Sequence, residues 1–228
     1  MIALKNLSVS FGDNKVLKDV SADFPLSEVH GLAGLNGSGK TTMFNAIAGF
    51  LKPENGEILY NGKRIRRNDF GFLETDNYFY PNITGNEYLR LFPDSNRKFS
   101  IDTFNALFKV PLDEIIETYS NGMRKKLAMM AILKQEKDFY ILDEPFNGLD
   151  MESCKLVEIV INMLREKGKT VFVSSHILDT LTDSCTFIHH LKEGRIVKSY
   201  GKEEYPLLKN EIFEEFRKSA EEVIGEMI

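Results

Sequence analysis

The chain lacks the features that mark secreted, zinc-binding and membrane-spanning proteins. It holds two cysteines among 228 residues, Cys154 and Cys185, which share no motif with each other or with histidine. We therefore expect no zinc site and reduced thiols, with a lone disulfide as the alternative. The N-terminus has no apolar signal-peptide core, and no run approaches the roughly 18 consecutive apolar residues of a membrane-spanning helix. If the protein works at a membrane, we expect another chain to supply the spanning part.

An excess of positive charge is also absent. The formal net charge is −5, and an acidic chain is a poor general binder of nucleic acid, so we expect no nucleic-acid partner. Hydrophobic residues make up 43% of the chain, which is enough to build a core and argues against disorder. We find no internal repeat and no low-complexity linker. A chain of this length suits one domain with appendages, or two small domains.

The order of the predicted elements indicates an α/β fold. Alternation of apolar and polar residues predicts a strand over 2–9, and a hairpin with an Asn-Gly turn follows at 57–65. From about residue 85 to 135, helical spacing replaces strand character. The other predicted elements are strands at 16–24, 28–33, 139–142 and 170–175, helices at 40–51 and 151–167, a late hairpin, and a helical tail from about 202. We therefore predict an α/β core that carries an antiparallel β subdomain and a helical subdomain.

A glycine-rich loop fits the pattern G-x-x-x-x-G-K-[ST]. Glycines let the backbone approach a phosphate without a Cβ clash, and successive N–H groups then form a nest for anions. Lys40 would add a point charge to the outer phosphates, and Thr41 would place its hydroxyl on Mg²⁺. An apolar strand precedes the loop and a helix follows it, which favours a phosphate site over a chance glycine-rich turn. The predicted nucleotide-binding residues of the loop are Gly34, Leu35, Asn36, Gly37, Ser38, Gly39, Lys40, Thr41 and Thr42.

A pair of carboxylates, Asp143 and Glu144, follows the apolar run at 139–142. An acidic strand end is common by itself, but ligands of open α/β sheets bind at such strand ends. Because the chain also carries a phosphate loop, we predict that Asp143 holds Mg²⁺ together with Thr41. Glu144 is the predicted catalytic general base, which would polarise the attacking water. The expected ligands are therefore ATP and Mg²⁺.

These motifs, and further segments in the same order, resemble the ATP-binding subunits of ABC transporters from end to end. The resemblance implies a P-loop NTPase (RecA-like) core within a single ABC ATPase domain, residues 1–228. The resemblance implies a nucleotide-binding core with its β subdomain at about residues 1–84 and 136–200. Residues of about 85–135 form the helical subdomain, and 201–228 a C-terminal helical tail.

The run Tyr-Ser-Asn-Gly-Met at 119–123 resembles the ABC signature, usually written L-S-G-G-Q. In the family this segment binds the γ-phosphate of the nucleotide held by the opposite subunit. The resemblance therefore implies trans contacts from Ser120, Asn121, Gly122 and Met123. A serine N-cap of a helix is the structural alternative, and both roles can coexist because they use the same backbone N–H groups. The substituted signature looks similar to those of ABC-2 and drug-exporter subunits.

Four more segments carry the resemblance. Asp150 lies in a segment similar to the D-loop, which crosses the dimer, and His176 resembles the switch histidine that contacts the γ-phosphate and orients water. Phe11 occupies the place of the A-loop aromatic that stacks on adenine, although it can equally be a core residue. The Q-loop is the departure, because its usual glutamine falls on Thr75, next to Glu74. The sequence leaves open whether Thr75 or a neighbouring carboxylate reaches Mg²⁺.

The resemblance implies an ATPase that powers transport through a separate transmembrane permease subunit, with export favoured over import. Two ATP-binding subunits would meet head to tail, as a homodimer or with a different second subunit. The expected location is cytoplasmic, peripheral on the inner face of the membrane. The rival interpretations are a non-transport ABC ATPase that acts on ribosomes or DNA, and a catalytically weak regulatory subunit. The transported substrate is not encoded in this chain's motifs.

Overall fold

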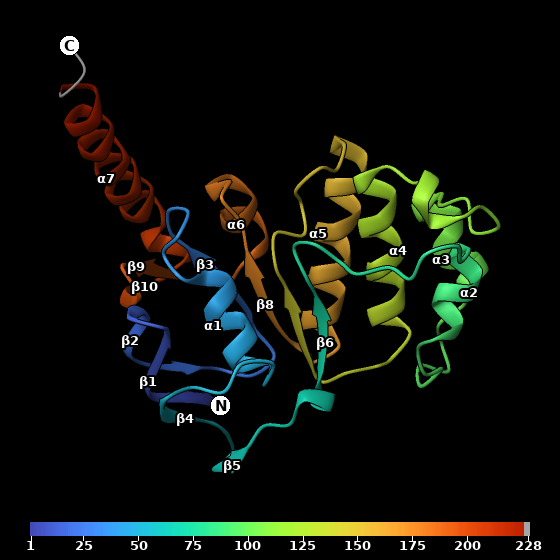
Figure 1. Ribbon diagram of the computed structural model, residues 1–228, viewed down its shortest axis with the longest axis horizontal. Coiled ribbons are helices and arrows are strands. Elements are labelled where there is room, and N and C mark those ends of the chain that lie inside the picture. Colours follow the sequence, from blue (N-terminus) through green and yellow to red (C-terminus); the bar gives the residue numbers. More distant parts are fainter. Residues whose placement is uncertain (226–228) are drawn as a thin grey trace.

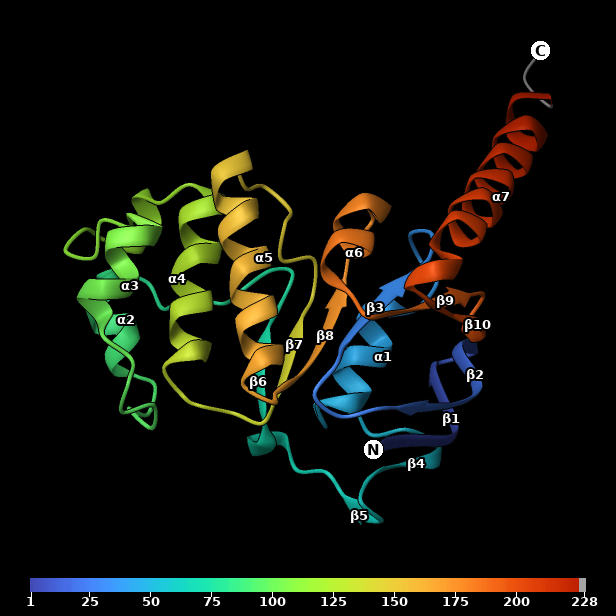
Figure 2. The same ribbon diagram turned by 180° about the vertical axis from the view of Figure 1, so that it is seen from behind.

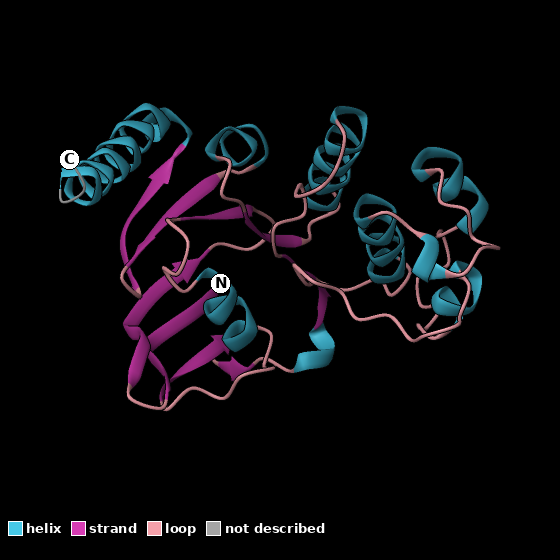
Figure 3. Cartoon of the chain, turned by 45° about the horizontal axis from the view of Figure 1, so that its top comes forward, coloured by secondary structure: helices cyan, strands magenta, loops and turns pink. Residues whose placement is uncertain are grey.

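The computed structural model describes residues 1–225 and has a mixed α/β architecture. The strands form two sheets, and one group of helices lies beyond the end of the larger sheet (Figures 1 and 3). Residues 226–228, the end of the predicted 201–228 tail, lie outside the described residues. Within residues 1–225, no helix combines the length and the hydrophobicity that crossing a bilayer needs. The proposed subdomain boundaries within the chain stay a prediction.

The smaller sheet is antiparallel, in the order β2-β1-β4-β5. Its strands pack apolar side chains against Met43 and Phe44 of α1 (Lys40–Ile47), the helix that follows the glycine-rich loop. The small sheet therefore covers one side of that helix. The strands are β1 (Ile2–Phe11), β2 (Asn14–Phe24), β4 (Asn55–Tyr60) and β5 (Lys63–Arg64).

The larger sheet has the order β10-β9-β3-β8-β7-β6, and its strands from β9 to β6 run parallel. Every residue of β3, β7 and β8 is buried, as expected for parallel strands covered on both faces. Parallel strands end at the same edge, so the segments after β3, β6, β7 and β8 meet there. The bounds are β3 (Val29–Ala33), β6 (Phe70–Leu73), β7 (Phe139–Leu142), β8 (Thr170–Ser174), β9 (Phe187–Lys192) and β10 (Arg195–Gly201).

Three helices gather beyond β6: α2 (Gly85–Arg90), α3 (Ile101–Phe108) and α4 (Asn121–Leu133). The long amphipathic helix α5 (Met151–Glu166) lies between α4 and α1 in both views of the chain (Figures 1 and 2). The short helix α6 (Leu178–Ser184) follows β8. Single 3₁₀ turns occur at Arg67–Asp69, Ile116–Thr118 and Lys202–Glu204.

The last helix, α7 (Tyr205–Gly225), starts on the body of the protein and then projects away from it (Figure 2). Tyr205 and Leu208 are buried, and the Tyr205 hydroxyl donates to the carbonyl of Cys185 at 3.0 Å. Further along, Phe213 and Phe216 are 65% and 60% exposed. The first turns of the predicted tail therefore pack on the core, whereas Phe213 and Phe216 face solvent.

The first helix is shorter than its sequence pattern predicts. The expected helix at 40–51 ends at Ile47, because Gly49 adopts a left-handed conformation with φ of 75°. A glycine after the last helical residue takes this conformation without the steric penalty of a Cβ. The four residues beyond Ile47 therefore belong to the turn that leads to β4.

Candidate nucleotide and catalytic site

The glycine-rich loop joins the end of β3 to the start of α1. A Cβ at Gly34 would lie 2.2 Å from the Leu191 carbonyl oxygen, so only glycine fits there. Gly37 and Gly39 have φ values of 80° and 107°, which side chains rarely allow. The buried Lys40 ammonium donates to the Gly34 carbonyl at 2.8 Å. The loop thus brings backbone N–H groups and a cation to the N-terminus of a helix, which suits a phosphate.

Asp143 follows β7 and is 1% exposed. Three hydroxyl groups surround its carboxylate. Thr41 and Thr75 donate to Oδ2 at 2.7 and 2.9 Å, and Ser174 donates to Oδ1 at 2.5 Å. Residues that are far apart in sequence therefore meet at one carboxylate, because they follow neighbouring parallel strands or the glycine-rich loop.

Glu144 and His176 form a pair at the same edge of the sheet. The His176 ring Nδ1 lies 2.8 Å from Glu144 Oε2, and the His176 backbone N–H donates to the same oxygen at 3.2 Å. Glu144 has a φ of 51°, a left-handed conformation that costs about 1–2 kcal/mol in a residue with a Cβ. Its backbone N–H donates to Ser174 Oγ at 2.9 Å, and its carbonyl accepts from Lys125 Nζ at 2.6 Å. Strain of this kind at a polar strand end is typical of functional sites.

Two buried lysines supply positive charge around these carboxylates. Burial lowers the pKa of Lys40, while the charges of Glu144 and Asp143 raise it. Burial likewise lowers the pKa of Lys125, against the opposing effect of Glu144, Asp143 and Asp76. The carboxylates thus favour the charged form of both amines in a site with little access to water.

The donor set around Asp143 fits a magnesium ion. Among the described residues, no group of three or more His, Cys, Asp and Glu side chains could hold a metal by itself. Mg²⁺ commonly uses one or two carboxylates and completes its shell with water and substrate phosphates. The Asp143 carboxylate and the Thr41 hydroxyl, directly after Lys40, offer hard oxygen atoms of that kind.

The residues predicted to lie at the contact with a second subunit occur at or near the N-termini of α4 and α5. Ser120 caps α4, since its hydroxyl accepts the Met123 backbone N–H at 3.3 Å. Gly122 lies against residue Gly148, whose carbonyl oxygen would be 2.9 Å from a Cβ at position 122. Asp150 caps α5 by accepting the Ser153 N–H at 2.7 Å, and hydrogen bonding from the Ser153 side chain and backbone lowers the pKa of Asp150. Ser120 and Gly122 lie at the N-terminus of α4, and α4 lies apart from α1 in both views of the chain (Figures 1 and 2).

The family model for the ABC transporter matches residues 17–147, more than half of the chain. This chain belongs to the ABC transporter family of ATP-binding proteins. An ABC transporter ATP-binding protein of Methanocaldococcus jannaschii is 32% identical over 88% of this chain and 77% of its own length. The lantibiotic transport ATP-binding protein SrtF of Streptococcus pyogenes is 28% identical over 86% of this chain and 89% of its own.

Solved structures agree with the family assignment. A structure described as the ATP-binding subunit of an ABC transporter has a TM-score of 0.79 and 28% identity, over 88% of this chain and 90% of the other. The P-loop NTPase fold predicted from the sequence is confirmed, with its α/β core and small antiparallel sheet. The chain is an ATP-binding subunit of the ABC transporter type.

The remaining predicted site residues of this ABC subunit are more exposed. Phe11, at the end of β1, is 55% exposed and so is not a core residue. Val16 in the following strand lies 3.3 Å from the position of a Cβ on Gly39, which brings this hairpin beside the glycine-rich loop. Ser38 Oγ is buried and has no hydrogen-bond partner among the described residues. Leu35, Asn36, Gly37 and Thr41 are exposed, whereas Thr42 and Glu74 are half-buried.

Sequence reasoning did not predict two residues that contact the predicted site residues Asp143 and Glu144. Ser174 bridges the Asp143 carboxylate and the Glu144 N–H, and Lys125 contacts the Glu144 carbonyl. A serine in the last position of a buried strand is a recognisable signal, because the polar end of a parallel strand faces the ligand edge. Lys125 lies between Arg124 and Lys126 in a run of three basic residues, so only its burial shows that it is unusual.

Proposed function

We propose that this chain hydrolyses ATP and powers export through a separate membrane subunit. The observation that carries the proposal is the convergence of Thr41, Thr75, Asp143, Glu144 and His176 beside the phosphate-binding loop. Each of these residues can serve a step of phosphoryl transfer to water, in which catalysis consists of positioning and charge stabilisation. The family assignment, from the matching model and the relatives, supports ATP as the nucleotide.

Binding of the nucleotide begins at the loop. The backbone N–H groups of residues 34–39 and the Lys40 ammonium would hold the phosphates, and Phe11 would stack on the adenine ring. Thr41 and Asp143 would hold Mg²⁺, which neutralises phosphate charge when bound. Thr75 keeps a hydroxyl on Asp143 Oδ2 and so orients the carboxylate, in the place where the family usually has glutamine. Glu74, the half-buried carboxylate next to Thr75, stays a second candidate for contact with the ion.

Glu144 would act as the general base for hydrolysis. Its Oε2 accepts from the His176 backbone N–H, and the His176 ring lies at hydrogen-bond distance. These contacts hold the carboxylate toward the edge where the outer phosphate would lie. Glu144 would take a proton from the attacking water while His176 orients the water and contacts the γ-phosphate.

A second ATP-binding subunit would complete each site. Ser120 and Gly122 lie at the N-terminus of α4, which is apart from α1 and the glycine-rich loop in both views of the chain (Figures 1 and 2). A head-to-tail pair would bring Ser120, Asn121, Gly122 and Met123 of one chain to the γ-phosphate held by the other, with Asp150 beside the junction. We propose a homodimer. Hydrolysis would remove the contacts of the γ-phosphate and open the pair.

The transport direction and the location are also part of the proposal, and one relative supports a transport role. SrtF is named as a lantibiotic transport protein, which supports export of a substrate by the present chain's complex. Because no helix among residues 1–225 could cross a bilayer, a permease subunit would supply the path. The chain would then lie in the cytoplasm, peripheral to the inner face of the membrane.

The test is a comparison of wild type with Glu144→Gln. Wild type should release phosphate from Mg-ATP, and the variant should lose about 10²–10⁴-fold in turnover while it still binds ATP. The variant should also double its mass of 26.1 kDa when Mg-ATP is added, because the closed pair accumulates. Glu166→Gln, an exposed change at the C-terminal end of α5, is the control and should behave as wild type. Equal turnover in wild type and Glu144→Gln would refute the proposed base.

A further inference from the structure

Lys125 is a buried lysine in the first turns of α4, two residues after the signature. It is 6% exposed, and its ammonium donates to the Glu144 carbonyl oxygen at 2.6 Å. The bond joins the helix that carries the signature to the backbone of the predicted catalytic base in the same chain. No family motif discussed above accounts for this lysine.

Stability alone does not explain a lysine at this position. Burying an ammonium group is unfavourable unless its partners fully compensate, and apolar residues of similar volume often replace buried charges without loss. The next turns of α4 bury Leu127, Met129 and Met130, so an apolar side chain would suit the helix. The specific contribution of Lys125 is therefore its contact with Glu144.

The backbone of Glu144 has a strained conformation, which needs contacts to maintain it. Its φ of 51° is left-handed, and the peptide groups on its two sides are both fixed. The N–H donates to Ser174 Oγ, and the carbonyl accepts from Lys125. Without the lysine, one of these two restraints is lost, and the backbone can relax toward an unstrained conformation. Such a rotation would carry the carboxylate away from His176 and the attacking water.

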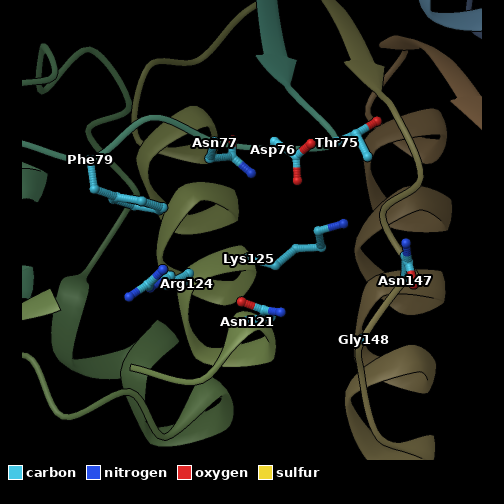
Figure 4. A pocket seen from close by; sticks show the side chains of 9 residues that line it. All are labelled: Thr75, Asp76, Asn77, Phe79, Asn121, Arg124, Lys125, Asn147 and Gly148. Carbon is cyan, nitrogen blue, oxygen red and sulfur yellow. The ribbon is translucent and has the colours of Figure 1, made fainter. Parts of the chain in front are cut away.

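Figure 4 shows the path of the lysine. Its side chain extends from α4 into a cleft of about 350 Å³, toward the segment that follows β7. The cleft separates the signature helix from the strand ends that carry the catalytic residues. It is lined by Thr75, Asp76, Asn77, Phe79, Asn121, Arg124, Lys125, Asn147 and Gly148. Lys125 therefore crosses this cleft and restrains Glu144 from the opposite side.

We propose that Lys125 is a positioning residue for ATP hydrolysis, which holds the strained backbone of Glu144 and ties its carboxylate to the placement of the signature helix. The inference rests on the proposed function of Glu144 as general base. It predicts an effect on turnover rather than on nucleotide binding, because Lys125 contacts neither the glycine-rich loop nor Asp143 through a hydrogen bond among the described residues.

The experiment compares Lys125→Met with Lys134→Met in the full chain. Lys134 is a matched control, since it is also 6% exposed, lies at the end of the same helix, and donates to the carbonyls of Leu89 and Phe92 at 3.1 Å, away from Glu144. We measure kcat for ATP, the dissociation constant of ATP, and the melting temperature of each variant. Lys125→Gln replaces Lys125→Met if the latter does not fold, because its amide is too short to cross the cleft.

The expected result is a fall of about tenfold or more in kcat for Lys125→Met, with an ATP dissociation constant within about twofold of wild type. Lys134→Met should keep the kcat of wild type, even if its melting temperature changes as much as that of Lys125→Met. Lys125→Arg should recover part of the loss in kcat. Unchanged kcat in Lys125→Met, or equal losses in both variants, would overturn the inference. Turnover in wild type that persists in Glu144→Gln would instead overturn the proposed function and leave Lys125 without a base to position.

Discussion

Replacement of Ser174 by alanine should weaken both the fold and the catalytic site. The Ser174 hydroxyl is buried, donates to Asp143 Oδ1 and accepts the Glu144 N–H. Ser174→Ala leaves these two groups without that partner, at about 1–3 kcal/mol each. We expect a loss of about 3 kcal/mol in the free energy of unfolding. For a domain of this size, that corresponds to a fall of about 6–12 °C in Tm.

The assay is urea denaturation of wild type, Ser174→Ala and Ser184→Ala, with the turnover of ATP measured in parallel. Ser184 is the matched control, because it is a buried serine whose hydroxyl has no hydrogen-bond partner among the described residues. Ser184→Ala should stay within about 0.5 kcal/mol of wild type. Ser174→Ala should also lose about tenfold or more in kcat, since the Glu144 backbone loses a restraint. Equal losses of stability in the two variants would refute the reasoning.

Three other perturbations probe separate parts of the structure. Gly34→Ala should abolish ATP binding in equilibrium titrations, because its Cβ would lie 2.2 Å from the Leu191 carbonyl oxygen. Thr75→Val removes the hydroxyl that donates to Asp143, the proposed magnesium ligand, and should raise the Mg²⁺ concentration for half-maximal ATPase activity about tenfold. Burial lowers the pKa of His30 to about 4 and that of His189 to about 3, whereas an unfolded histidine titrates near pH ~6.5. The unfolded chain therefore binds more protons below that pH, and urea titrations should show a loss of stability on the order of 2 kcal/mol per histidine as the pH falls from ~6.5 to ~4.5.

Each of these predictions has a contrary outcome. ATP binding by Gly34→Ala with wild-type affinity would mean that the loop can move away from Leu191. An unchanged Mg²⁺ requirement in Thr75→Val would remove Thr75 from the ion's surroundings. For the histidines, His189→Gln should lose less stability than wild type between the two pH values, because one titrating group is gone. Parallel losses in wild type and His189→Gln would assign the acid sensitivity to other groups.

The sequence predicted the elements whose signals are local. The fully apolar strand at 139–142 and the glycine-rich loop at 34–42 lie as expected, because each is defined by adjacent residues. The short strand β6 and the short helix α6 had no such signal and were not predicted as elements. The helix at 40–51 was predicted four residues too long at its C-terminus, because a left-handed glycine conformation is decided by the turn around it.

At the Q-loop, too, the sequence predicted the local position but not the contact that depends on the tertiary structure. The sequence located Thr75 at the position of the usual glutamine but left its partner open. The structure gives it one, the Oδ2 of Asp143, because β6 lies beside β7 in the larger sheet. The order of strands in a sheet depends on which strands pack side by side in the folded protein. A single sequence carries little information about that order.

The sequence by itself determined the family, the phosphate loop and the carboxylate pair, because the chemistry of these sites needs particular residues at fixed spacing. The tertiary structure decided which distant side chains support them. Ser174 is 31 residues from Asp143, and Lys125 is 19 residues from Glu144, yet each forms a hydrogen bond there. Such contacts depend on the parallel order of the strands and on the packing of α4 beside the sheet. Buried polar groups need hydrogen-bond partners, and the tertiary structure decides which residues are near enough to supply them.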